Sequence, residues 1–246
     1  MGAQERDACN PITAVRHARP LWYDSAMTRN DKHLGILAIC LSALAGYVDA
    51  VGFIHLGGFF LFSVSANTTL MGIGLAEGSA RAAIAAGLIG TFVLGVMAGS
   101  IVLHRARHHP RAAVLILVCM LLLGAASLSA FDVAHGPIVA MAMAMGAANS
   151  VFERDDEASS GLMSLTAPLV KLGEKIAGMD EGNGRSWSHY LLLWLGFVLG
   201  AVAGAGIYQM VALGTVWIAT VAAALLAFAA TRIEKVGAAP PGVFDA

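Results

Sequence analysis

The residues of this sequence that could do chemistry are polar side chains inside long apolar stretches. Asp49 lies near the end of one such stretch, and Ser65, Asn67 and Thr68 interrupt the next one. Polar and ionisable side chains are costly inside a membrane and mark either a functional site or a satisfied hydrogen bond. For Asp49, an ion or proton site, a cap on the interrupted segment and a carboxylate that is simply hydrated near the outer interface all remain open. For Asn67, Ser65 and Thr68, solute contact and stabilisation of a helix break also remain open.

A second set of polar residues follows about one hundred residues later along the chain. Asn149 ends one apolar stretch, and Thr166 and Lys171 lie in another interrupted stretch. Lys171 and Glu174 are three residues apart, a spacing that puts both on one face of a helix. The segment is therefore either an amphipathic helix at the cytoplasmic interface or a wall of a cavity in which Lys171 attracts an anion.

Composition sets the environment in which these residues act. Of the 246 residues, 58% are hydrophobic and 13% are charged, and the mean hydropathy is +0.73. Soluble domains carry about 25% charged residues, so this composition predicts a membrane protein with the lipid bilayer as its main partner. The net charge of -1 and the lack of a basic stripe give no sign of nucleic-acid binding. The three scattered cysteines, and histidines surrounded by arginines, predict neither a metal site nor a cofactor.

These polar residues are held in place by apolar stretches that are long enough to cross a bilayer. A membrane-spanning helix needs about 20 apolar residues. Six stretches qualify or nearly qualify: Leu34–Ile54, Ala82–Leu103, Ala112–Ala130, Val133–Phe152, Tyr190–Val211 and Leu213–Thr231. Residues 59–76 and 162–176 form two interrupted stretches, which would span the membrane, re-enter it or lie at its interface.

The distribution of Lys and Arg favours six crossings. If only the six uninterrupted stretches cross, every basic cluster falls in the cytoplasm and the two loops without Lys or Arg fall outside. This predicts a bacterial inner-membrane protein with both termini cytoplasmic. We expect a disordered cytoplasmic tail over 1–33, with Met27 as an alternative start, then a membrane domain over 34–231 and a cytoplasmic tail over 232–246.

The membrane domain contains signs of an internal repeat, with halves at 34–130 and 133–231. Gly46 and Asp49 recur as Gly146 and Asn149, at an offset of about one hundred residues. The pair Gly95 and Gly99 recurs as Gly196 and Gly200, and Ser65-Ala-Asn as Thr166-Ala-Pro. Three crossings in each half place the second half upside down relative to the first. Inverted repeats with interrupted helices are common in secondary transporters, although a fold does not fix a function.

Glycines at four-residue spacing predict close helix packing. They are Gly95 and Gly99 in the second predicted crossing, and Gly196, Gly200 and Gly204 in the fifth. Small residues at this spacing let membrane helices approach closely. These two crossings could pack against each other within one subunit or between subunits. The repeat favours the contact within one subunit, and the oligomeric state stays open.

The sequence also resembles a known family. Gly46-Tyr-Val-Asp-Ala-Val-Gly-Phe53, Gly57-Gly-Phe59 and Ser65-Ala-Asn-Thr-Thr69 are similar to the signature of the YoaK-like family of uncharacterised bacterial membrane proteins. The resemblance covers roughly 34–231. Family members have glycine where Ala66 and Ala167 stand here, which puts the backbone freedom of both interrupted segments in question. The resemblance implies a membrane fold but no substrate.

These features favour a small secondary transporter or channel for an ion or small polar solute. The alternative is a membrane scaffold or sensor that moves nothing. An intramembrane enzyme is the least favoured class, because the predicted spans contain no paired carboxylates, Ser–His pair or metal-ligand motif. We therefore expect no catalytic residues.

Overall fold

The computed structural model describes residues 21–131, 133, 135–152, 169–170, 173, 177 and 187–237. All regular elements within these residues are helical, as composition predicts, and none of the described residues lies in a strand. The helices are α1 (Leu21–His55), α2 (Val64–Ala76), α3 (Arg81–Arg105), α4 (Pro110–Ala130), α5 (Gly136–Asn149), α8 (Trp187–Val211) and α9 (Val216–Gly237). Two short 3-10 helices, η1 (Ser150–Phe152) and η2 (Ala212–Thr215), follow α5 and α8.

Four helical runs among the described residues are long and apolar enough to cross a membrane. They are His33–His55, Arg81–Arg105, Pro110–Ala130 and Leu191–Lys235. The last run contains both α8 and α9, which are separated at η2, where Ala212 has a φ of 46°. Gly136–Phe152 is apolar but shorter. Each of the six predicted crossings overlaps a helix, whereas length and hydropathy identify four candidate spans.

Helix α1 begins earlier than the predicted membrane domain. It starts at Leu21 and therefore includes the end of the 1–33 segment that the sequence assigns to a tail. Its 35 residues, at about 1.5 Å each, exceed the roughly 30 Å hydrocarbon core. The helix thus continues well beyond the apolar segment from which the prediction was made.

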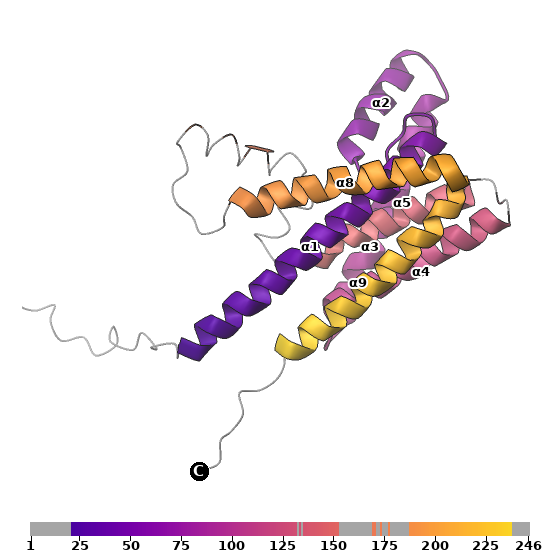
Figure 1. The fold of residues 1–246 in the computed structure, drawn as a ribbon. Helices are drawn as coiled ribbons and strands as arrows, with labels where there is room; N and C mark the ends of the chain where they lie inside the picture. The colour runs from indigo at the N-terminus through magenta and orange to yellow at the C-terminus, as the bar shows by residue number, and fades with distance from the viewer. Residues whose placement is uncertain are drawn as a thin grey trace, which may run out of the picture.

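The helices pack in pairs around a buried apolar core. Helix α8 lies along α1, α3 packs against α5, and α4 packs against both α5 and α9 (Figure 1). The α5 helix contributes several of the most buried side chains, including Met141 and Met145. Helix α2 stands apart from the bundle in Figure 1 and packs against α3. Only Asn67 and Gly74 of α2 are buried.

The helix ends establish the direction in which each helix runs. At one end of the bundle, a cavity of about 440 Å³ is lined by His55 at the end of α1, Tyr208 near the end of α8, and His135 just before α5. At the other end, His109 before α4 lies 3.5 Å from Glu234 near the end of α9. Helices α1, α4 and α8 therefore run in one direction, and α5 and α9 run in the other.

Candidate functional site

Asp49 is held against the loop that joins α1 to α2. Its side chain is 5% exposed. Its Oδ1 accepts hydrogen bonds from the backbone N–H groups of Leu61 at 2.6 Å and Phe62 at 2.8 Å. The position of Asp49 on α1 thus fixes the path of the chain just before α2.

Asn67 holds the same loop from the α2 side. It is 3% exposed, its Nδ2 donates to the Phe60 carbonyl at 2.6 Å, and its Oδ1 accepts from the Phe60 N–H at 3.1 Å. The Phe60–Phe62 loop is therefore bonded on one side to Asp49 and on the other to Asn67. The turn that leads into it contains Gly57 and Gly58 at φ of 66° and 115°, backbone conformations that favour glycine.

These bonds satisfy backbone groups of a non-helical segment. Lipid supplies no hydrogen-bonding partner, so non-helical peptide groups at membrane depth need partners from the protein. Asp49 and Asn67 provide them for three consecutive residues. The second carboxyl oxygen of Asp49, Oδ2, has no hydrogen-bond partner among the described residues. Asp49 therefore holds the loop through one of its two carboxyl oxygens.

Ser65 and Thr68 do not join this site. Both are exposed on α2, and the Thr68 hydroxyl donates to the Val64 carbonyl of its own helix at 2.9 Å. Asn149 is half-buried, and its Nδ2 donates to the Met145 carbonyl within α5 at 2.8 Å. Thr166 and Lys171 lie outside the described residues. Of the predicted site residues that the structure describes, it brings together Asp49 and Asn67.

The predicted glycines pack helices closely, but within the described chain they do not join the second predicted crossing to the fifth. A Cβ at Gly200 would overlap the Ala43 carbonyl of α1, and one at Gly204 would overlap the carbonyl of Tyr47. A Cβ at Gly196 would come 3.0 Å from the carbonyl oxygen of Ile39. These three glycines therefore pack α8 against α1.

The glycines of α3 behave in the same way toward another helix. A Cβ at Gly95 would overlap the Met143 carbonyl of α5, and one at Gly99 would lie 2.9 Å from the Ala147 carbonyl oxygen. The sequence comparison had favoured α3 packing against α8. Glycine spacing indicates how closely a helix can be approached, but it does not select the helix that approaches.

Sequence reasoning did not select the polar residues at the end of the bundle. His55 Nδ1 and Tyr208 Oη are 3.0 Å apart, and both line the cavity of about 440 Å³ together with His135. Tyr47 Oη donates to the Thr215 carbonyl at 3.1 Å, which ties α1 to η2. Aromatic residues at span ends are ordinary in membrane proteins, so this signal alone could not single them out. No group of three potential metal ligands from His, Cys, Asp or Glu occurs among the described residues.

Several apolar helical runs of membrane-spanning length define a multi-pass α-helical membrane protein. The chain belongs to the family described as "Protein of unknown function (DUF1275)", whose sequence profile matches residues 37–229. It is 31% identical over 200 residues to a UPF0700 transmembrane protein of Rhizobium meliloti (strain 1021), which covers 81% of this chain and 87% of that relative. No solved structure matches. The predicted membership of an uncharacterised family of bacterial membrane proteins is confirmed.

Proposed function

We propose that this protein is a small secondary transporter or channel that moves an ion or small polar solute between two inverted halves. In this proposal the chain crosses the bacterial inner membrane six times, with α1, α3, α4, α5, α8 and α9 as the crossings. The distribution of Lys and Arg in the sequence supports cytoplasmic termini. Inverted repeats of this kind place solute sites near the bilayer midplane, at interrupted helices.

The observation that carries the proposal is that two helix pairs pack through corresponding residues. Helix α1 meets α8 through the pairs Ala43–Gly200, Gly46–Phe197 and Tyr47–Gly204. Helix α5 meets α3 through the pairs Met143–Gly95, Gly146–Phe92 and Ala147–Gly99. Each α1 residue has its α5 counterpart 100 positions later (43 to 143, 46 to 146 and 47 to 147). Each α3 residue has its α8 counterpart 105 positions later (92 to 197, 95 to 200 and 99 to 204).

The directions of the helices support the inversion. Helix α1 ends at the cavity beside which α5 begins, so the two corresponding helices run in opposite directions. Helix α4 likewise begins beside the end of α9. Antiparallel counterparts are what an inverted-topology repeat requires.

Asp49 is the residue that we propose contacts the transported ion or a coupled proton. It is buried in a span, and Oδ2 is free of hydrogen bonds from the described residues, whereas Oδ1 fixes the Phe60–Phe62 loop. Binding at Oδ2 would therefore be coupled to the position of the loop and of α2. In this proposal, the cavity lined by His55 and Tyr208 at one end of the bundle serves as the entrance for the solute.

A membrane scaffold or sensor is the second candidate, and one specific observation favours it. Both polar atoms of the Asn67 amide and Oδ1 of Asp49 are used by backbone groups of the Phe60–Phe62 loop. These two residues could thus be retained for structure alone. In that case no solute would bind at Asp49.

Thermal stability of the purified protein in detergent, measured across a panel of inorganic ions and small polar solutes, tests the proposal. A solute at one hundred times its dissociation constant should stabilise the fold by about 2.7 kcal/mol. The same panel is run on Asp49→Asn, whose side-chain oxygen can still accept the loop's hydrogen bonds, and on Ser65→Ala as an exposed control. We expect one class of solute to stabilise the wild type and Ser65→Ala but not Asp49→Asn, and to cross liposome membranes that contain the protein.

Two results would contradict the transport proposal. The first is a panel in which no ion or solute stabilises the wild type. The second is a stabilising solute whose effect is unchanged in Asp49→Asn and which shows no flux into liposomes. Either result would favour the scaffold.

A further inference from the structure

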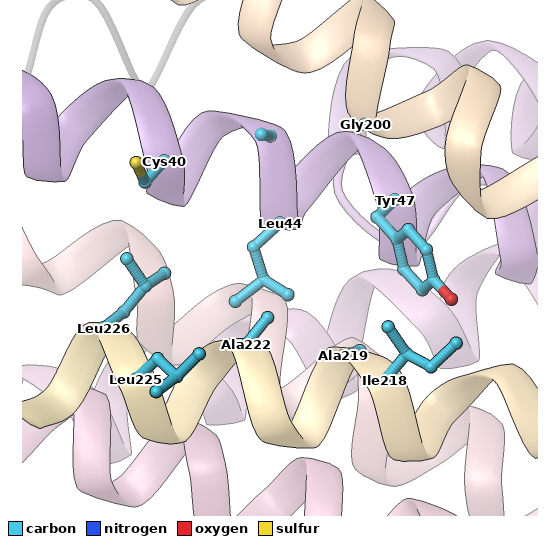
Figure 2. A pocket seen from close by; sticks show the side chains of 10 residues that line it. Cys40, Leu44, Tyr47, Gly200, Ile218, Ala219, Ala222, Leu225 and Leu226 are labelled. Atoms are coloured by element: carbon cyan, nitrogen blue, oxygen red, sulfur yellow. The ribbon is translucent and has the colours of Figure 1, made fainter.

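A second cavity, unrelated to the Asp49 site, lies in the middle of the predicted spans. It is a groove of about 330 Å³ between α1, α8 and α9 (Figure 2). Its lining consists of apolar and small side chains apart from one phenol and one thiol: Cys40, Ala43, Leu44, Tyr47, Gly200, Ile218, Ala219, Ala222, Leu225 and Leu226.

The groove exists because small residues face one another where the three helices meet. Gly200 presses α8 onto Ala43 of α1, which closes the groove on that side. Across from α1, helix α9 contributes Ala219 and Ala222, whose side chains are too short to fill the space. The result is a hollow rather than an interdigitated helix contact.

The chemistry of the lining excludes a polar occupant. The hydroxyl of Tyr47 is already bonded to the carbonyl and hydroxyl of Thr215, and thus offers no free partner at the groove. The Cys40 thiol is only a weak donor. A polar solute that entered would lose its hydrogen bonds to water without replacing them, at a cost of several kcal/mol. The groove is therefore suited to hydrocarbon.

The shape and direction of the groove match a hydrocarbon chain. Figure 2 shows Cys40 near Leu225 and Leu226 at one end and Tyr47 near Ile218 and Ala219 at the other. The groove therefore follows the helix axes for about 10 Å, at roughly 1.5 Å per residue from Cys40 to Tyr47. Ile218 is 47% exposed and Leu225 is 65% exposed, so the groove opens on the outer surface of a membrane span.

We propose that this groove holds an acyl chain of a membrane phospholipid, seated between α1 and α9. The medium around a membrane span is lipid hydrocarbon, and an empty groove would leave its wall atoms without van der Waals partners. An acyl chain is long and narrow, as the groove along the helix axes is, and it needs no hydrogen bond. The proposal is independent of solute transport, because no residue of the groove belongs to the Asp49 site.

The test uses the full-length protein in phosphatidylglycerol and phosphatidylethanolamine vesicles that carry a photoactivatable diazirine in the acyl chain. Labelled residues are located by peptide mass spectrometry. Leu44 is only 5% exposed, whereas Leu199 and Val202 on the outer face of α8 are 67% and 66% exposed. Contact with bulk lipid alone should label residues in proportion to exposure. With a resident chain, labelling of Leu44 should equal or exceed that of Val202.

Matched substitutions on α9 separate the groove from the general lipid-facing surface. Ala222→Phe places a ring in the groove, and Ala224→Phe adds the same ring at an exposed position outside the lining. We expect Ala222→Phe, and the smaller Ala222→Leu if the first variant does not fold, to reduce labelling of Leu44 several-fold. Ala224→Phe should leave it unchanged. Two results would overturn the proposal. The first is wild-type labelling that is proportional to the exposure of each residue. The second is labelling of Leu44 that persists in Ala222→Phe or Ala222→Leu.

Discussion

Replacing Asp49 by alanine should destabilise the protein through the Phe60–Phe62 loop. The substitution removes the single oxygen that accepts from the Leu61 and Phe62 N–H groups, at 2.6 and 2.8 Å. A buried donor left without a partner costs about 1–3 kcal/mol. Because the Phe62 bond is only partly buried, we expect the free energy of unfolding to fall by about 2–4 kcal/mol, below the sum of two full penalties.

Asp49→Asn separates the hydrogen-bonding role from the charge. The asparagine oxygen can accept the same two bonds, so its cost in unfolding free energy should be about 1 kcal/mol or less. The assay is reversible unfolding in mixed detergent micelles, combined with hydrogen exchange at the Leu61 and Phe62 amides. Exchange at these two amides should accelerate strongly in Asp49→Ala and only slightly in Asp49→Asn.

One pattern would refute this reasoning about the loop. If Asp49→Ala unfolds at the wild-type denaturant concentration and its Leu61 and Phe62 amides exchange at the wild-type rate, then the two hydrogen bonds do not hold the loop. If Asp49→Asn is as unstable as Asp49→Ala, the carboxylate charge, rather than its acceptor geometry, is what the fold requires.

Three further substitutions test the contacts between helices. Gly200→Ala should lower the free energy of unfolding by about 1–3 kcal/mol, because its Cβ would overlap the Ala43 carbonyl. Gly206→Ala is the control: it has open space around it and should be neutral or slightly stabilising. Equal thermal midpoints for the two variants would contradict this packing of α8 on α1. Tyr47→Phe should cost about 0.5–1.5 kcal/mol in the same unfolding assay through the lost bond to η2, and an unchanged midpoint would count against that bond. Glu234→Ala should lower the free energy of unfolding by about 1–3 kcal/mol, because Oε1 of Glu234 accepts a hydrogen bond from the Arg111 backbone N–H at the start of α4, at 2.9 Å. Glu234→Gln keeps an acceptor at this position, so its loss of unfolding free energy should be less than half as large.

The sequence was sufficient to predict a helical membrane protein and to locate Asp49 and Asn67. A carboxylate or amide in an apolar stretch can be recognised in the sequence because the residues around it are apolar. The hydrogen-bond partners of these side chains cannot be recognised in the sequence. They are backbone N–H and C=O groups of a loop, and backbone groups occur at every position of a chain. Ser65 and Thr68 were selected on the same grounds but stay outside the site. A threonine hydroxyl in a helix can bond to the carbonyl four residues earlier, as Thr68 does, so its presence does not require a site.

The alignment of the two halves of the proposed repeat could not be determined from the sequence alone, but the helix contacts determine it. Sequence comparison aligned Gly95 and Gly99 with Gly196 and Gly200, whereas the helix contacts align them with Gly200 and Gly204. The difference is about one helical turn. A run of glycines at four-residue spacing resembles itself after a shift of one turn, so the sequence alone cannot choose between the two registers. The contacts can choose, because only the second register pairs Ala43 and Met143 with corresponding glycines, and that register also aligns Phe92 with Phe197.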